Sequence, residues 1–151
     1  MTGLWKTWMT VWWWTMLAAA VVFLLAALPG LDGPVLAFYD VIHWPFDGQS
    51  GFAEATRPTA AILGAVFIGW MLTVRLVMDL AEKAEPAAAA RLWRNLTGVM
   101  LVWYGVDSAA SFVTGVPVNA VSNTAILATY LIPLLGSGVM AGAGAASPRS
   151  A

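Results

Sequence analysis

The residue in this sequence best suited to chemistry is Asp107, an acid inside a long apolar stretch. At helical spacing Asp107 shares a face with Trp103 and Ser111, and Asn119 and Asn123 lie one turn apart in the next apolar stretch. A carboxylate at membrane depth costs about 2.5–3.5 kcal/mol on insertion scales, so it is expected to face other helices and to have polar partners there. These side chains could bind a ligand or a proton, or they could bond one helix to another.

Counting along the two stretches places Asp107 and Asn123 at the same depth. Asp107 lies six residues before Val113, and Asn123 lies six residues after Pro117, so each is ~9 Å from the same end at ~1.5 Å per residue. The short connector makes the two helices antiparallel neighbours. Arg57 opens another stretch at this end. The sequence therefore predicts one polar cluster, made of Asp107, Ser111, Asn119, Asn123 and Arg57.

A structural role is the first interpretation of this cluster. Hydrogen bonds between membrane helices contribute ~0.6 kcal/mol on average and fix the register of the helices. A site for a ligand or a proton is one alternative, and an interface with another chain is a second. Asp107 alone cannot relay a proton across a membrane, because the first two stretches carry no other titratable group at mid-depth.

Four apolar stretches must position these residues, and each is long enough to cross ~30 Å of hydrocarbon as a helix of ~20 residues. They cover residues 9–28, 58–78, 92–113 and 117–140. The 151-residue chain is 60% hydrophobic and 10% charged, which leaves too few charges to coat a soluble globule. The sequence predicts an all-α integral membrane four-helix bundle over residues 1–140, with a flexible tail over residues 141–151.

The basic residues give the predicted orientation. Six of them fall on one side of the four spans: Lys6, Arg75, Lys83, Arg91, Arg94 and Arg149. Only Arg57 falls on the other. Because the side rich in lysine and arginine stays in the cytoplasm, we expect both termini to be cytoplasmic. The first span is longer and richer in tryptophan than the core of a signal peptide, so we expect it to remain uncleaved.

The segments between the spans carry predictions of their own. Residues 34–44 are apolar but too few to span, which predicts an interfacial helix or a re-entrant segment capping the bundle, followed by a turn at Asp47–Gly48. The segment Asp79–Glu85 is expected to extend the second span, and Pro86 to start the next helix. Pro133 is expected to kink the fourth span.

Small residues recur at intervals of four in two spans, a pattern that lets helix backbones approach closely. They are Ala61, Ala65 and Gly69 in the second span, and Gly105 and Ala109 in the third. We expect them to pack helices within the bundle, and a homodimer face is the alternative.

Several functional classes are excluded or disfavoured. A net charge of −1 without a basic stripe argues against nucleic acid. The chain has no cysteine and a single histidine, His43, so thiolate and bis-histidine sites cannot form. His43 lies near Asp40 and Asp47, but a hydrogen-bonded loop residue is the simpler interpretation. No catalytic or cofactor motif is present, so we expect no enzyme, no cofactor and no metal.

Three segments resemble known proteins. They are Ala65–Trp70, the loop element His43–Gly48, and Val102–Ser108, the last followed by Gly115, Asn119 and Asn123–Thr124. These segments resemble small uncharacterised four-span proteins of the bacterial inner membrane. The resemblance implies four helices and that location, and it implies no activity.

Two hypotheses about function remain. The first is a non-enzymatic structural or accessory membrane protein, a homo-oligomer or a subunit of a larger complex, with the lipid bilayer as its other partner. The second is a binder or transporter of a small molecule or ion, using the polar cluster around Asp107.

Overall fold

The computed structural model describes residues 1, 3–44, 48, 52–53 and 56–141. The described residues form five helices: α1 (Gly3–Leu25), α2 (Gly33–Ile42), α3 (Thr56–Lys83), α4 (Pro86–Val113) and α5 (Val118–Ser137). All but α2 are long and apolar enough to cross a membrane. The predicted all-α architecture, four spans with a short helix between the first two, is confirmed.

The positions of proline and glycine determine where the helices begin and end more closely than the limits of the apolar stretches do. The second and third spans are longer than the apolar stretches, and they are separated by Ala84 and Glu85. Glu85 is extended (φ −57°, ψ 149°), as residues before proline prefer to be. Pro86 then occupies the first turn of α4, where its missing N–H costs nothing. α5 ends at Ser137, before the predicted end at residue 140, because Gly138 adopts a left-handed φ of 64°.

Some sequence predictions fall on residues outside the described part of the chain. Asp47 of the predicted turn and residues 142–151 of the predicted tail are among them.

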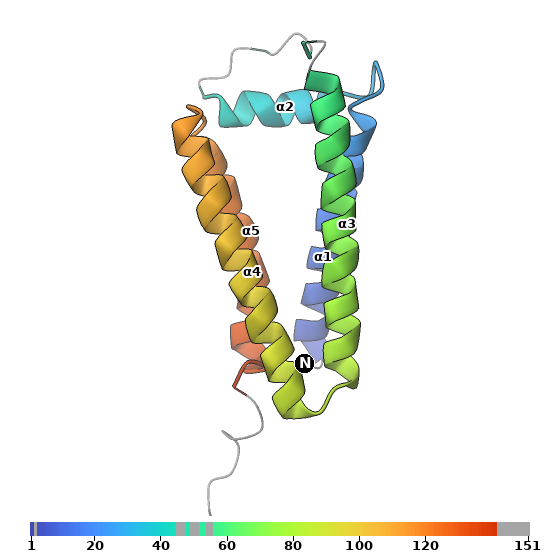
Figure 1. Ribbon diagram of the computed structural model, residues 1–151, viewed down its shortest axis with the longest axis vertical. Helices are drawn as coiled ribbons and strands as arrows, with labels where there is room; N and C mark the ends of the chain where they lie inside the picture. The colour runs from blue at the N-terminus through green and yellow to red at the C-terminus, as the bar shows by residue number, and fades with distance from the viewer. Residues whose placement is uncertain (2, 45–47, 49–51, 54–55, 142–151) are drawn as a thin grey trace, which may run out of the picture.

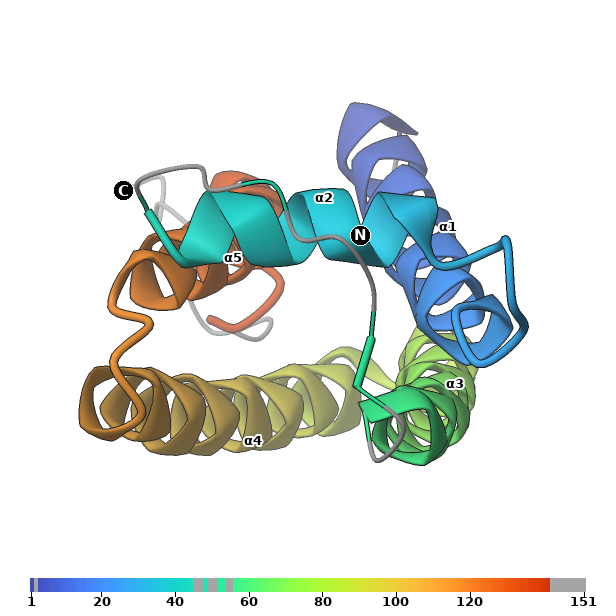
Figure 2. The ribbon, with the colours of Figure 1, turned by 90° about the horizontal axis from the view of Figure 1, so that it is seen from above.

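The spans form two antiparallel pairs, α1 with α3 and α4 with α5 (Figures 1 and 2). The pairs lie close together at the end that carries the N-terminus and diverge toward the other end (Figure 1). α2 lies across this second end, running from α1 to α5 (Figure 2), and contacts both. We call the two ends the N-terminal end and the α2 end.

The main apolar core lies where the two pairs converge. Trp12 of α1 packs against Tyr130 of α5 with ring centroids 5.4 Å apart, and Trp70 of α3 packs against Trp103 of α4 at 5.5 Å. A second, smaller core lies at the α2 end and contains Ala26, Val35, Ala60, Val22, Phe23, Tyr39 and Phe52. These residues come from α1, α2, α3 and the connecting segments. The two pairs are therefore packed together over one part of their length only.

α1 and α3 are joined by a close backbone contact. A Cβ added to Gly64 would lie 2.7 Å from the Cα of Leu24, so only glycine fits there. Ala20 and Ala60 are fully buried, and the Trp13 Nε1 donates a buried hydrogen bond of 2.7 Å to the Met71 carbonyl.

α1 meets α5 near Pro133, which lies inside α5. Proline has no N–H, so the carbonyl four residues earlier, that of Thr129, lacks its helical donor. The Trp8 Nε1 donates to this carbonyl at 2.9 Å. One turn further on, Gly136 makes room for Trp5, whose ring would lie 2.5 Å from an added Cβ.

Candidate functional site

Three levels of polar contact join α4 to α5. Nearest the N-terminal end, the Thr97 Oγ1 lies 3.2 Å from the Tyr130 hydroxyl. Further along, the Tyr104 hydroxyl lies 3.1 Å from the Thr124 Oγ1. The third level, closest to the α2 end, is centred on Asp107.

At the third level, two amides hold the Asp107 carboxylate. The Asn123 Nδ2 donates to the Asp107 Oδ2 at 2.7 Å, and the Asn119 Nδ2 donates to the same oxygen at 3.4 Å. Asn119 also donates to the Ser111 Oγ at 2.9 Å, and that hydroxyl donates to the Asp107 carbonyl at 2.7 Å. The structure therefore brings together four of the five residues of the predicted cluster. Ser108, which follows Asp107 in α4 but was not part of the predicted cluster, accepts from Asn123 at 3.4 Å.

Arg57 is the fifth residue, and it lies elsewhere. Its Nη2 donates to the Asp32 Oδ2 at 2.6 Å, its Nη1 donates to the Ala26 carbonyl at 3.3 Å, and its guanidinium lies 5.7 Å from the Phe52 ring centroid. These contacts tie the start of α3 to the segment between α1 and α2. The sequence held a signal for this pair, because Asp32 follows the first span at the end of the bundle where Arg57 opens the second.

Asp107 lies on the face of α4 that is turned toward the interior of the bundle. Trp93, Met100 and Asp107 are spaced by seven residues, so they lie on one face of α4. Trp93 and Met100 are 4% and 0% exposed, whereas Asp107 is partly exposed. Exposure on this face of α4 therefore increases toward the α2 end, the end at which the two pairs diverge (Figure 1).

Aromatic side chains lie one helical turn from Asp107 toward the N-terminal end. Trp103 is on the same side of α4, and its ring packs on Trp70, which in turn packs on Phe67 at 5.6 Å. A carboxylate and a group of aromatic rings therefore lie at neighbouring levels of the bundle axis.

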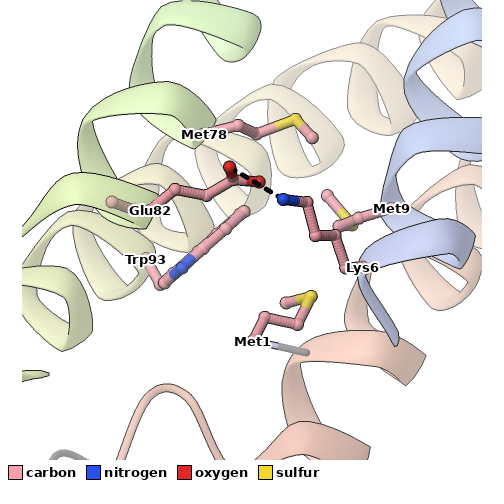
Figure 3. Close-up of a pocket in the computed structure, with 7 residues that line it drawn as sticks. Met1, Lys6, Met9, Met78, Glu82 and Trp93 are labelled. Atoms are coloured by element: carbon pink, nitrogen blue, oxygen red, sulfur yellow. Dashed lines mark hydrogen bonds and ion pairs between the residues drawn. The ribbon is translucent and has the colours of Figure 1, made fainter. Parts of the chain in front are cut away.

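A second candidate region is a hollow at the N-terminal end, where Lys6 of α1 and Glu82 of α3 point toward one another between Met9, Met78 and Trp93 (Figure 3). The Lys6 Nζ lies 3.0 Å from the Glu82 Oε2. Both side chains are substantially exposed, and exposed ion pairs contribute little. The hollow offers a weak connection between α1 and α3 and no group arranged for catalysis.

The remaining candidates lie apart from both regions. The His43 ring is exposed, and its Nδ1 lies 2.9 Å from the Tyr39 carbonyl, as a hydrogen-bonded loop residue would. Within the described part of the chain, no group of three or more histidine, aspartate or glutamate side chains could hold a metal ion.

The small residues picked out by the sequence lie mostly on the outside. Ala65 and Gly69 of α3 are exposed, as are Gly105 and Ala109 of α4, while Ala61 is partly buried. A Cβ at Gly69 or Gly105 would meet nothing within 4 Å. The close contact inside the bundle is made at Gly64, one residue away from Ala65.

We call the three levels of polar contact between α4 and α5 the polar seam. The four long apolar helices define the class: the chain is a multi-pass helical membrane protein with four spans. Comparison with models of protein families, with curated proteins and with solved structures finds no match.

Proposed function

We propose that this chain is a non-enzymatic structural or accessory protein of the bacterial inner membrane that associates with further copies of itself. The observation that carries the proposal is the outward position of Ala65, Gly69, Gly105 and Ala109. Small residues on a lipid-facing surface let a second helix approach closely, and such packing is a main source of helix association in membranes.

The polar seam between α4 and α5 supports the same proposal. Its side chains bond mainly to one another across the two helices, which fixes the register of the pair. A pair held in fixed register presents its outer faces to a partner without having to rearrange.

Native mass spectrometry of the protein, extracted gently from its own membrane, tests this proposal. The wild-type chain is expected to appear as an oligomer, and the Gly69→Leu and Gly105→Leu variants are expected to shift it toward monomer. Ala125→Leu is the matched control, because it enlarges an exposed small residue on α5, away from both stripes. A wild-type monomer would contradict the proposal, and a second co-purifying polypeptide would replace self-association with a role as a complex subunit.

The same proposal places both termini and the N-terminal end of the bundle in the cytoplasm, on the evidence of the basic residues. Because the chain has no cysteine, single cysteines can report its orientation without background. An impermeant thiol reagent applied to intact cells should label Val41→Cys on α2 and leave Ala84→Cys, between α3 and α4, unlabelled. The reverse pattern would invert the orientation.

A second candidate function is the binding or transport of a small molecule or ion. The observation that favours it is that Asp107, inside a span, is partly exposed, since an ionisable residue inside a span often marks a functional site.

A further inference from the structure

Exposure rises along α3 and α4 between the contact of Trp70 with Trp103 and the α2 end. On α3, Leu63 lies seven residues before Trp70 and therefore on the same face, yet it is 46% exposed. On α4, exposure begins at Asp107, seven residues beyond the fully buried Met100. We call this region, bounded by Leu63, Asp107 and the Trp70–Trp103 contact, the axial opening. Figure 1 shows the two helix pairs diverging there beneath α2.

The Asp107 carboxyl group in the axial opening has no cationic partner among the described residues. None of the ion pairs in the described part of the chain includes Asp107, and Arg57, the basic residue at this end, is bound to Asp32. The hydrogen bonds from Asn119 and Asn123 both reach Oδ2. Within the described residues, no hydrogen bond reaches the other oxygen, Oδ1, so it can accept from a ligand.

The surroundings favour an organic cation over a metal ion. Hard metal ions require several converging oxygen ligands, but Asn119 and Asn123 present their amide nitrogens to the carboxylate. Aromatic rings attract organic cations through their negative faces, and Trp103 and Trp70 lie one turn below Asp107. Leu63 and Phe67 add apolar surface for a hydrocarbon body.

We propose that the axial opening binds an amphipathic organic cation, with its positive group at the Asp107 Oδ1 and its apolar body against Trp103 and Trp70. Such a ligand would enter from the bilayer, where apolar cations concentrate. The inference rests on the second candidate function and does not require that the chain self-associate.

Equilibrium binding of radiolabelled tetraphenylphosphonium to the protein in lipid nanodiscs tests the proposal. The wild-type chain is expected to bind this cation saturably and to bind tetraphenylborate, an anion of the same shape, much more weakly. Asp107→Asn, which keeps the size of the side chain, is expected to weaken binding of the cation about tenfold or more. Asp79→Asn is the matched control, because Asp79 pairs with Arg75 at the far end of α3, and it should leave binding unchanged.

A second pair of variants tests the proposal independently, in case Asp107→Asn fails to fold. Trp103→Leu is expected to weaken binding about fivefold by removing the aromatic face, while Trp103→Phe retains most of the affinity. Equal binding of the cation and the anion, or unchanged affinity in a folded Asp107→Asn protein, would overturn the proposal, as would a wild-type chain that binds neither ion. Since the Gly69→Leu and Gly105→Leu variants leave the axial opening intact, they separate a failure of self-association from a failure of this site.

Discussion

The two helix pairs of this protein are built in opposite ways. α1 and α3 approach until their backbones touch at Gly64 and Leu24, with alanines on either side of the contact. α4 and α5 are joined through side chains, by hydroxyl, amide and carboxylate groups at three levels. A membrane offers little hydrophobic force between helices, so association depends on close packing or on polar bonds. Each pair relies mainly on one of these two sources, so the pairs should respond to different mutations.

The largest effect is expected at the close contact between α1 and α3. Gly64→Ala should destabilise the fold by about 1–3 kcal/mol, because the new Cβ would overlap backbone atoms of Leu24 that cannot rotate away. Unfolding in mixed micelles would measure the loss. Gly98→Ala is the matched control, since a Cβ there meets nothing within 4 Å, and alanine should leave stability unchanged or raise it. If Gly64→Ala and Gly98→Ala changed the stability equally, close backbone packing would not be what distinguishes the α1–α3 pair from the α4–α5 pair.

A smaller effect is expected in the polar seam. Asn123→Ala removes the 2.7 Å hydrogen bond to Asp107 and leaves the longer bond from Asn119, which should cost about 1 kcal/mol. The same unfolding experiment applies, with Ser122→Ala as the neighbouring control outside the cluster. In an Asp107→Asn background the cost of Asn123→Ala should shrink, because the two residues are coupled. If Asn123→Ala lowers the free energy of unfolding equally with and without Asp107→Asn, Asn123 acts through packing alone.

The smallest effect is expected at the Lys6–Glu82 ion pair, which links α1 to α3 outside their close contact. Lys6→Met keeps the apolar stem of the side chain and should cost about 0.5 kcal/mol or less, since exposed pairs are screened by solvent. The cost should fall further in high salt. A salt-independent loss as large as that of Gly64→Ala would show that this end, and not the backbone contact, holds α1 to α3.

The sequence predicted the four spans and the short helix because these follow from length, hydropathy and proline positions. It also placed Asp107 level with Asn123, because a short connector and a fixed rise per residue leave little freedom. Whether these residues bind a ligand stays a prediction. The position of Arg57 was not predicted, because the sequence places several acids at the same end and nothing in their spacing decides between Asp32 and Asp107.

The sequence also could not predict how α3 is rotated about its own axis, and therefore which of its faces packs against α1. Ala61, Ala65 and Gly69 form a regular small-residue stripe, but the face that meets α1 carries Ala60 and Gly64. In a soluble helix, polar residues would mark the outer face. In a span that is apolar on every side, neighbouring stripes look alike, and only the packed structure chooses between them.

The hydrogen bond from Trp8 to the Thr129 carbonyl has a consequence for how the chain is made. Pro133 leaves α5 with a backbone acceptor that it cannot satisfy alone, and an unsatisfied carbonyl in hydrocarbon costs several kcal/mol. The donor that satisfies it lies on α1, which leaves the ribosome long before α5 does. We therefore expect α5 to be fully stabilised in the membrane only once α1 lies beside it.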